Sequence, residues 1–303
     1  MTLRFDGRVA IVTGAGGGLG RCHALALAAR GAKVVVNDLG GAVDGRGGSA
    51  TAAERVAEEI RAAGGEAFAN GASVTDVGQV EAMVAEAMER WGRIDILVNN
   101  AGILRDKSFT KMDLADFRAV IDVHLMGAVH CTKAVWEIMR AQNYGRIVMT
   151  TSSSGLFGNF GQSNYGAAKM ALVGLMQVLS LEGMKNDIRV NCLAPTAATR
   201  MTESLFTPDV LERMVPDAVS PAVVALVAED APTRAILCAG AGSFERAYIT
   251  LTQGIHVSAK DGVADEVAAR FAAISDRGGD IVPESAFDQG KLEMEKAQSA
   301  SDK

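Results

Sequence analysis

Three side chains in this sequence have the types and spacing of an acid–base site. Tyr165 and Lys169 are four residues apart in a stretch with helical character, so they would share one face of a helix. A free tyrosine, with a pKa near ~10, is a poor base at neutral pH, and a neighbouring ammonium group lowers that pKa. Ser152 precedes Tyr165 at the predicted end of a strand, where its hydroxyl could hydrogen-bond a substrate oxygen. The set predicts proton transfer at a substrate oxygen.

A glycine-rich turn lies far upstream, at Thr13–Gly20, directly after an apolar run. Gly14 permits a tight turn, Gly18 lets the backbone approach a pyrophosphate, and Gly20 lets helix and strand pack closely. The following helix, which begins around Leu19, offers free N–H groups and the positive end of its dipole to an anion. Because the turn joins a strand to a helix, it predicts a dinucleotide-binding loop.

Asp38 follows the second apolar run, about 20 residues past this loop. A carboxylate at that place accepts hydrogen bonds from the adenosine ribose and would repel a 2′-phosphate. Asp38 therefore favours NAD over NADP. Arg46, in the glycine-rich stretch that follows, either meets a phosphate or is a solvated loop residue, the latter preferred.

The elements that must position these residues alternate along the chain. Short apolar runs, typical of strands covered on both faces, predict strands at 9–12, 34–36, 94–98, 146–150 and 188–193. Helical patterns occupy 19–30, 50–63, 76–91, 113–140 (with Asp113 as N-cap and a break near Gly127) and 164–184. This order predicts an α/β fold of the Rossmann type, a doubly wound parallel sheet with helices on both faces.

No repeat or linker divides the chain, so residues 1–240 are predicted to form one dinucleotide-binding domain. Residues 241–303 would be a C-terminal extension packed on that domain, with a sheet-edge segment at 244–253, a candidate strand at 248–257, a helix at 263–274 and a frayed polar tail at 288–303. The extension's helix would either pack on its own subunit or narrow a substrate cleft, its own or a neighbour's, for a long substrate.

Composition excludes other classes of protein. The net charge of −6 opposes nucleic-acid binding. The four cysteines have no metal-ligand or disulfide spacing, so neither a metal site nor a disulfide framework is expected. The N-terminus lacks the apolar core of a signal peptide, no apolar run is long enough for a membrane span, and the C-terminus is no peroxisomal address. We expect a cytoplasmic protein.

Together these motifs resemble the short-chain dehydrogenase/reductases, and the resemblance covers about residues 5–240. The matching residues are Thr13–Gly20, Asn99–Gly102, Ser152, Tyr165, Lys169 and Pro195–Thr199. The resemblance implies hydride transfer at a nicotinamide ring, with Tyr165 as acid/base, Lys169 on the nicotinamide ribose and Ser152 polarising the reacting oxygen. It further implies cofactor contacts from Asn100, Ala197 and Thr199, the last near the carboxamide.

The narrower resemblance is to the dehydrogenase domains of peroxisomal multifunctional enzymes of type 2, also called 17β-hydroxysteroid dehydrogenases type 4. It rests on the segments Leu3–Arg8, Val36–Gly41, Asn99–Asp106, Tyr144–Arg146, Gly158–Gln162 and Arg200–Thr202. It implies NAD-dependent oxidation of a (3R)-3-hydroxyacyl-CoA to the 3-ketoacyl-CoA in fatty-acid or steroid side-chain β-oxidation. The alternative is a 17β-hydroxysteroid dehydrogenase acting on a free sterol alcohol.

Several positions have open roles. Leu156, Phe157 and Phe160 could line an acyl pocket, while Arg105 and Lys107 either contact CoA phosphates or are solvated surface residues, the latter preferred. The following departures from the family pattern bear on the cofactor and the chemistry.

His124 stands where many family members have asparagine, and it would tether a water near Lys169 or simply pack. Gly71–Val74 lacks the common aspartate, so the adenine contact falls to Ser73 and Val74, and Pro195–Thr196 replaces a Pro-Gly pair. Surplus apolar residues on the helices at 113–140 and 164–184 predict a homodimer or homotetramer.

Overall fold

The computed structural model describes residues 2–49, 51–198, 207–258 and 261–301. Its sheet has the strand order β3-β2-β1-β4-β5-β6-β7-β8. The strands are β1 (Val9–Thr13), β2 (Lys33–Asn37), β3 (Ala67–Asn70), β4 (Ile96–Asn99), β5 (Gly145–Thr150), β6 (Ile188–Thr196), β7 (Ile236–Gly240) and β8 (Ser243–Ala247). This eight-stranded, mostly parallel sheet with flanking helices confirms the predicted Rossmann-type α/β fold.

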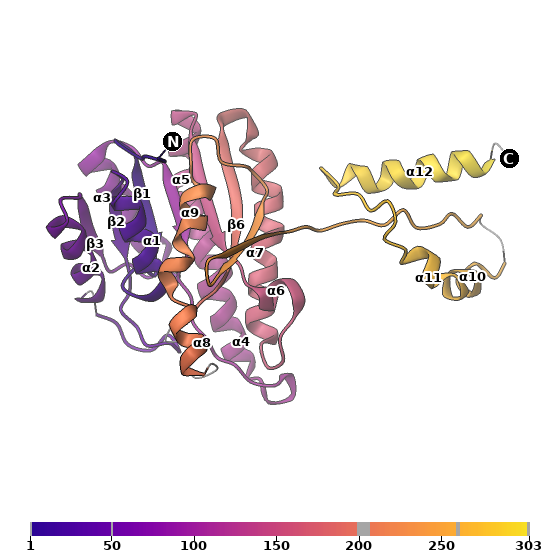
Figure 1. Ribbon diagram of the computed structural model, residues 1–303, viewed down its shortest axis with the longest axis horizontal. Coiled ribbons are helices and arrows are strands. Elements are labelled where there is room, and N and C mark those ends of the chain that lie inside the picture. The colour runs from indigo at the N-terminus through magenta and orange to yellow at the C-terminus, as the bar shows by residue number, and fades with distance from the viewer. Residues whose placement is uncertain (1, 50, 199–206, 259–260, 302–303) are drawn as a thin grey trace. The chain divides into compact units, whose positions relative to one another are not determined.

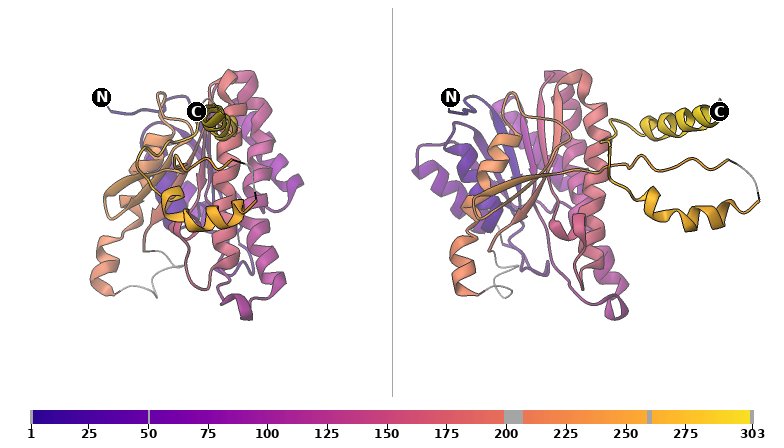
Figure 2. Two further views of the ribbon diagram at one scale, coloured as in Figure 1. Left: turned by 90° about the vertical axis from the view of Figure 1, so that its right-hand side faces the viewer. Right: turned by 45° about the vertical axis from the view of Figure 1, so that its right-hand side comes forward.

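The helices fall between the strands. They are α1 (Gly18–Ala28), α2 (Thr51–Ala62), α3 (Val77–Trp91), α4 (Leu114–Ile121), α5 (Gly127–Gln142), α6 (Ser153–Phe157), α7 (Ser163–Glu182), α8 (Pro208–Arg213) and α9 (Ser220–Leu226). Helix α1 packs against α2 and α9, and helix α3 packs against α5 (Figure 1). Helix α7 packs on strands β5 and β6. Two views turned about the vertical axis show the sheet between its helical layers (Figure 2).

The core strand β1 pairs in parallel with β2 on one side and with β4 on the other. All five residues of β1 are buried, as a strand covered on both faces requires. Because chain connections run outward in both directions from this pair, a crevice opens beyond the carboxyl ends of β1 and β4. Thr13 and Asn99, at those ends, are therefore at the edge where a cofactor would bind.

The strands β7 and β8 are joined by Ala241 and Gly242, whose φ angles are +49° and +77°. Positive φ at both central residues is the geometry of a tight two-residue hairpin turn, so β8 runs antiparallel to β7. Strands β3 and β7 are not predicted from the sequence, whereas β8 overlaps the sheet-edge segment predicted at 244–253.

The helix predicted at 113–140 forms, with a different irregularity. Asp113 caps it as expected, since its Oδ1 accepts from the Ala115 N–H at 2.8 Å. Instead of a break near Gly127, a π-helical turn, η2 (Asp122–Met126), joins α4 to α5. Gly127 follows at once, and a Cβ there would lie 2.6 Å from Cγ2 of Val74. Such π turns often occur at functional sites, and this one holds His124.

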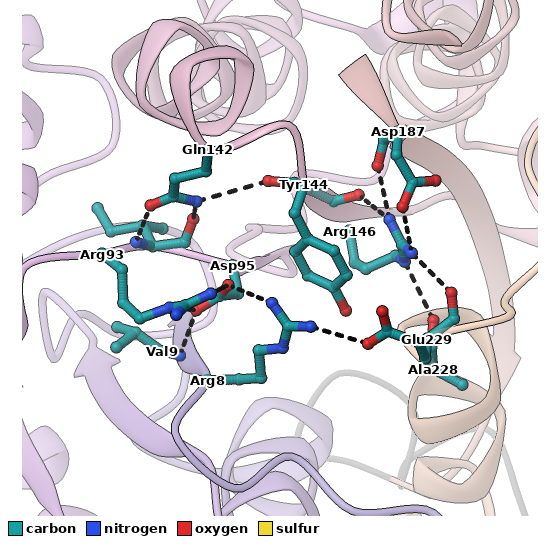
Figure 3. Close-up of polar contacts among 12 residues, drawn as sticks. Arg8, Val9, Arg93, Asp95, Gln142, Tyr144, Arg146, Asp187, Ala228 and Glu229 are labelled. Atoms are coloured by element: carbon teal, nitrogen blue, oxygen red, sulfur yellow. Dashed lines mark hydrogen bonds and ion pairs between the residues drawn. The ribbon is translucent and has the colours of Figure 1, made fainter. Parts of the chain in front are cut away.

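The opposite, amino edge of the sheet is tied together by buried charges (Figure 3). The guanidinium of Arg146 is fully buried and donates to the carbonyl oxygens of Gly145, Asp187, Ala228 and Glu229 and to the Asp187 carboxylate. The ring of Tyr144 lies between the guanidiniums of Arg146 and Arg8, whose Cζ atoms are 4.1 and 3.7 Å from its centroid. This network joins β5 to the start of β6 and to the turn after α9.

A second salt-bridge centre at this edge surrounds the buried carboxylate of Asp95. It accepts from the guanidiniums of Arg8 at 3.0 Å and Arg93 at 2.6 Å, and from the Val9 N–H at 2.9 Å. Because these contacts use both carboxylate oxygens, the buried charge is compensated. The start of β1 is thereby fixed against the start of β4, opposite the crevice.

The chain divides into two compact units, Met1–Arg246 and Ala247–Lys303. In the second unit, the prediction of a strand at 248–257 is wrong, because these residues form only an isolated bridge between Leu251 and Ile281. The helix predicted at 263–274 is broken at Arg270 into α10 (Val263–Ala269) and α11 (Phe271–Ile274). The predicted frayed tail is also wrong, because α12 (Phe287–Ser301) is helical.

Candidate active site

A cleft of about 330 Å³ opens at the carboxyl edge of β1, β4 and β5. It is lined by most of the residues singled out from the sequence, namely Gly14, Gly18, Leu19, Gly20, Asp38, Ser73, Val74, Asn100, His124, Tyr165 and Lys169. Ser152 and Ala197 are buried beside this edge but do not line the cleft, and Thr199 lies outside the described residues. The fold therefore brings the predicted cofactor and catalytic residues to one place.

The glycine loop has the backbone geometry that its spacing predicts. Gly14 has φ +64°, and a Cβ there would lie 2.8 Å from Cα of Ala101. A Cβ on Gly20 would lie 2.2 Å from the carbonyl oxygen of Gly14, so only glycine fits. Asn100 fixes the loop by donating its side-chain amide to the carbonyl oxygens of Thr13 at 2.9 Å and Gly14 at 3.2 Å.

The helix α1 begins at Gly18 without a side-chain cap, and its first turn holds no acidic residue. The N–H groups of a first turn have no partner within their own helix and attract anions. The loop and this helix start fit the pyrophosphate of a dinucleotide.

Asp38 lies directly after β2 and beside the glycine loop. Its Oδ2 accepts from the Gly16 N–H at 2.7 Å, and its Oδ1 accepts from the Gly40 N–H at 2.6 Å. Each carboxylate oxygen can accept a further hydrogen bond. Two backbone N–H groups therefore orient this carboxylate at the edge of the cleft and leave it capacity to accept further hydrogen bonds.

The wall formed by residues 72–74 is held by its neighbours. The Ala72 N–H donates to Asn70 at 2.9 Å, and the Ser73 N–H donates to Gln79 at 2.9 Å. His130 of α5 hydrogen-bonds through Nδ1 to the carbonyl oxygen of Val74 at 2.9 Å. The role of His130 is not predictable from the sequence, since nothing in its spacing marks it as a partner of a loop 56 residues upstream.

Ser152 and Tyr165 lie within hydrogen-bonding reach of each other. Ser152 caps the short helix α6, with its Oγ accepting from the Ser154 N–H at 3.1 Å. Burial raises the pKa of Tyr165, while a hydrogen bond with Ser152 lowers it and the charge of Asp106 raises it slightly further. The sequence predicts a tyrosine pKa lowered by Lys169; in the structure, burial outweighs any lowering.

Lys169 lies one helical turn after Tyr165 on α7, as predicted. Its Nζ donates to the carbonyl oxygen of Thr150 at 2.6 Å and lies 5.4 Å from the centroid of the Tyr165 ring. Burial lowers the pKa of Lys169 to about 7. An amine with that pKa exchanges protons readily at neutral pH, as a proton-transfer site requires.

His124 is buried close to Tyr165 and Lys169. Its Nε2 lies 3.0 Å from the Ile103 nitrogen and 2.8 Å from the Ile103 oxygen. Its Nδ1 is buried without a hydrogen-bond partner in the described structure. Burial, reinforced by the charge of Lys169, holds the pKa of His124 well below its usual value, so the ring is neutral.

The candidate substrate residues separate into two groups. Phe157 and Phe160 are 73% and 90% exposed, so they are available to a substrate rather than packed in the core. Arg105 and Lys107 instead both pair with Asp116, each at 3.0 Å. Within the described residues, no cluster of histidine, cysteine, aspartate or glutamate could hold a metal ion, and no helix is long and apolar enough to cross a membrane.

A family model described as short chain dehydrogenase matches residues 8–209. The chain belongs to the short-chain dehydrogenase family. It is thus an oxidoreductase of that family, and the matched range contains the glycine loop, Ser152, Tyr165 and Lys169.

The relatives include multifunctional and single-function members of the family. Peroxisomal multifunctional enzyme A of Dictyostelium discoideum is 47% identical over 287 residues, 94% of this chain and 64% of that enzyme. Peroxisomal multifunctional enzyme type 2 of Mus musculus is 52% identical over 227 residues, 75% of this chain and 30% of that enzyme. A short-chain type dehydrogenase/reductase of Mycobacterium tuberculosis is 48% identical over 273 residues, 90% of this chain and 95% of that protein.

Solved structures of similar proteins include a multifunctional enzyme and a hydroxysteroid dehydrogenase. The full-length peroxisomal multifunctional enzyme type 2 of Drosophila melanogaster has a TM-score of 0.79 and 36% identity, covering 97% of this chain and 50% of that one. A 7α-hydroxysteroid dehydrogenase in complex with NADH and 7-oxo glycochenodeoxycholic acid has a TM-score of 0.71 and 32% identity, covering 79% of this chain and 95% of that one. The predicted resemblance to the type 2 multifunctional enzymes is confirmed.

Proposed function

We propose that this chain oxidises a (3R)-3-hydroxyacyl-CoA to the 3-ketoacyl-CoA with NAD as hydride acceptor. The observation that carries the proposal is the meeting of Ser152, Tyr165 and Lys169 beside a glycine loop that ends at a free helix N-terminus. The likeness to multifunctional enzymes of type 2 supports the acyl-CoA substrate and its (3R) configuration.

The carboxylate of Asp38 supports NAD as the cofactor. Two backbone N–H groups orient it toward the cleft, where it would accept from ribose hydroxyls. A phosphate on the same ribose would face this negative charge. A bound NAD supplies the hydride acceptor, and the family relative solved with NADH is consistent with a nicotinamide cofactor.

The proton chemistry falls to this chain's own side chains. In this structure the Ser152 hydroxyl accepts from the Ser154 N–H and hydrogen-bonds Tyr165; with substrate bound, its O–H would donate to the substrate oxygen instead. Tyr165, once ionised to the phenolate, takes the proton of the substrate hydroxyl as the carbonyl forms. Lys169 carries two further N–H donors besides the one directed at Thr150, and its charge favours the phenolate.

A second candidate function is oxidation of a free sterol alcohol. It is supported by the likeness over 79% of this chain to a hydroxysteroid dehydrogenase. The exposed rings of Phe157 and Phe160 offer apolar surface to either substrate. The multifunctional relatives favour the acyl-CoA ester, which we therefore place first.

The test is NADH formation by the purified chain with a panel of substrates. The panel contains (3R)- and (3S)-3-hydroxyacyl-CoA esters of several lengths, steroid side-chain CoA esters and free 17-hydroxysteroids. We expect turnover of the (3R) esters with NAD. Turnover of the free steroids alone would establish the second candidate, and turnover of only the (3S) esters would contradict the proposed stereochemistry.

The variant Tyr165→Phe is the control for the site. Because general acid–base catalysis contributes roughly 10²–10⁴-fold, we expect kcat to fall by about that factor while the Kd for NAD stays nearly the same. A Tyr165→Phe enzyme that retained most of its kcat would show that another group moves the proton. The cytoplasmic location predicted from the sequence stays a prediction, since several relatives carry peroxisomal names.

A further inference from the structure

A glycine-rich strap, residues 39–49, covers part of the cleft directly after Asp38. Leu39, Gly41, Ala42, Val43 and Gly45 of the strap line the cleft. The Ser49 N–H donates to the Leu39 carbonyl at 2.8 Å, which closes the strap at its base. The Gly40 N–H donates to Asp38 at 2.6 Å, so the position of the strap and the orientation of that carboxylate are linked.

The tip of the strap is fastened to the segment that follows β4. The Leu104 N–H donates to the carbonyl oxygen of Val43 at 3.0 Å, and Nε of Arg105 donates to the carbonyl oxygen of Asp44 at 3.0 Å. Gly45 has φ +85°, and a Cβ there would lie 3.0 Å from Cγ2 of Ile103. Two hydrogen bonds therefore hold the strap tip in place, and Gly45 lies too close to Ile103 for a side chain to fit without displacement.

The same segment is fastened on its other side to the start of α7, which carries Tyr165. The carbonyl oxygen of Arg105 accepts from the buried side-chain amide of Asn164 at 3.0 Å. The Asp106 carboxylate accepts from Gln162 at 2.6 Å, and the Lys107 N–H donates to the carbonyl of Gly161 at 2.9 Å. The segment thus spans the distance between the cofactor wall and the catalytic helix.

Arg105 is the one side chain of this segment that reaches the strap with a charged donor. Its Nη1 pairs with Asp116 at 3.0 Å, and the side chain is 25% exposed. A guanidinium presents its donors in a planar fork, so the two contacts fix its orientation between Asp116 and the strap. A lysine ammonium, as a single point charge, cannot reproduce both contacts.

We propose that Arg105 is a positioning residue for the cofactor, acting through the strap on Asp38. This inference rests on the proposed function, because it concerns the NAD that Asp38 would bind. Arg105 holds the strap tip, the strap holds the Gly40 N–H against Asp38, and the carboxylate is presented to the ribose. Arg105 therefore governs NAD affinity and leaves the proton transfer at Tyr165 unaffected.

The experiment compares Arg105→Ala and Arg105→Lys with the wild type. Direct NAD binding is measured by calorimetry, and kcat and KM are measured for NAD and for acyl-CoA. We expect the Kd and KM for NAD to rise about tenfold in both variants, the effect of losing one charge-assisted hydrogen bond. At saturating NAD, kcat and the KM for acyl-CoA should stay at the wild-type values. The matched control is Arg140→Ala, which removes an exposed arginine paired with Glu137 on the remote end of α5.

A second variant tests the strap without removing a charge. Gly45→Ala introduces a strained φ and a close contact with Ile103, so it should displace the strap tip and raise the Kd for NAD in the same way. Thermal unfolding of each variant establishes that the protein is folded.

Three results would overturn the inference. An unchanged Kd for NAD in folded Arg105→Ala would do so, as would a rise only in the KM for acyl-CoA, which would assign Arg105 to the CoA phosphates. A wild-type chain that fails to bind NAD would overturn the proposed function together with this inference, so the two failures are distinguishable.

Discussion

The imidazole ring of His124 meets the phenol ring of Tyr165 edge to face, with 5.1 Å between their centroids. Such a contact orients an aromatic pair and contributes about 0.5–1.5 kcal/mol beyond the burial of area. A cavity of about 10 Å³ lies against both His124 and Lys169, close to the space that one water molecule needs. His124 is therefore placed to orient the tyrosine and to offer Nδ1 to a water beside the lysine.

Replacing His124 with phenylalanine separates these two contributions. The ring contact with Tyr165 would be kept, while both nitrogens would be lost and the Ile103 N–H would lose its acceptor. We expect kcat to fall about tenfold and the protein to be destabilised by roughly 1–3 kcal/mol. Steady-state kinetics and urea unfolding measure the two effects. A destabilised His124→Phe enzyme with wild-type kcat would show that His124 only packs.

The buried Lys169 makes stability depend on pH in a defined direction. Its pKa is lowered from 10.5 to about 7 in the fold, so the folded protein binds fewer protons than the unfolded chain between these values. The free energy of unfolding therefore rises with pH across that window. The cost of burying the charged ammonium of Lys169 is fully present below pH 7.

Lys169→Met removes this titration, so the unfolding free energy of the wild type minus that of the variant should increase between pH ~7 and ~10. Denaturant unfolding of both proteins across this range measures the difference. A difference independent of pH would mean that the ammonium is not desolvated.

Asp38→Ala tests the choice of cofactor. Losing a charge-assisted hydrogen bond of roughly 1.5–3 kcal/mol should weaken NAD binding about ten- to hundredfold and relieve the discrimination against NADP. The variant Asp38→Asn keeps the size and one acceptor oxygen, so it should lose less NAD affinity than the alanine variant. Kinetics with both cofactors measures these ratios. A wild-type preference for NADP would contradict the role assigned to Asp38.

Truncation after Arg246 tests the C-terminal unit. Among the residues 247–258 and 261–300, whose exposure the structure describes, none is buried, so these residues form no core of their own. A role beside a substrate cleft predicts that the truncated enzyme has a raised KM for acyl-CoA and an unchanged KM for NAD. Acyl-CoA kinetics equal to those of the full chain would exclude that role.

The helices predicted to form the homo-oligomer interface expose fewer apolar side chains than the sequence suggests. Val120 and Val135 of the first helix and Leu172 of α7 are buried within the protomer. Val178 and Leu181 of α7 remain 53% and 44% exposed. Light scattering should show a mass well above 31.6 kDa, and Val178→Glu should shift it toward the monomer. A wild-type monomer at micromolar concentration would contradict the prediction.

The predictable parts of the fold are those with short, dense sequence signals. The apolar run of β1, Val9–Thr13, is followed by glycines and then by an Ala/Leu-rich helix. This order has few interpretations other than a strand, a dinucleotide-binding loop and a helix, so each part supports the assignment of the others. Helical periodicity predicts that Tyr165 and Lys169 share one face of a helix, and both lie on α7. Strand β3 (Ala67–Asn70) was missed, since alanine and asparagine have low strand propensity and its pairing with β2 is a tertiary effect.

The unpredicted features of the site depend on contacts between distant residues. The lowered pKa of Lys169 comes from burial, which its sequence neighbours do not reveal. The π turn around His124 is invisible to a 3.6-residue periodicity, and the contact of His130 with Val74 joins residues 56 positions apart. The tail Phe287–Ser301 forms a helix despite its polar composition, because alanine, glutamate and lysine favour helix whether or not a face is buried.

The buried guanidinium of Arg146 has a consequence for the order in which the chain matures during synthesis. Two of its acceptors, the carbonyls of Ala228 and Glu229, are made more than 80 residues after the arginine itself. Until Ala228 and Glu229 leave the ribosome, the guanidinium of Arg146 on β5 lacks two of its hydrogen-bond acceptors. Burying a charge without its partners is strongly unfavourable. The glycine loop and Tyr165 are synthesised before this turn, but the sheet that supports them closes only when the turn after α9 has been made.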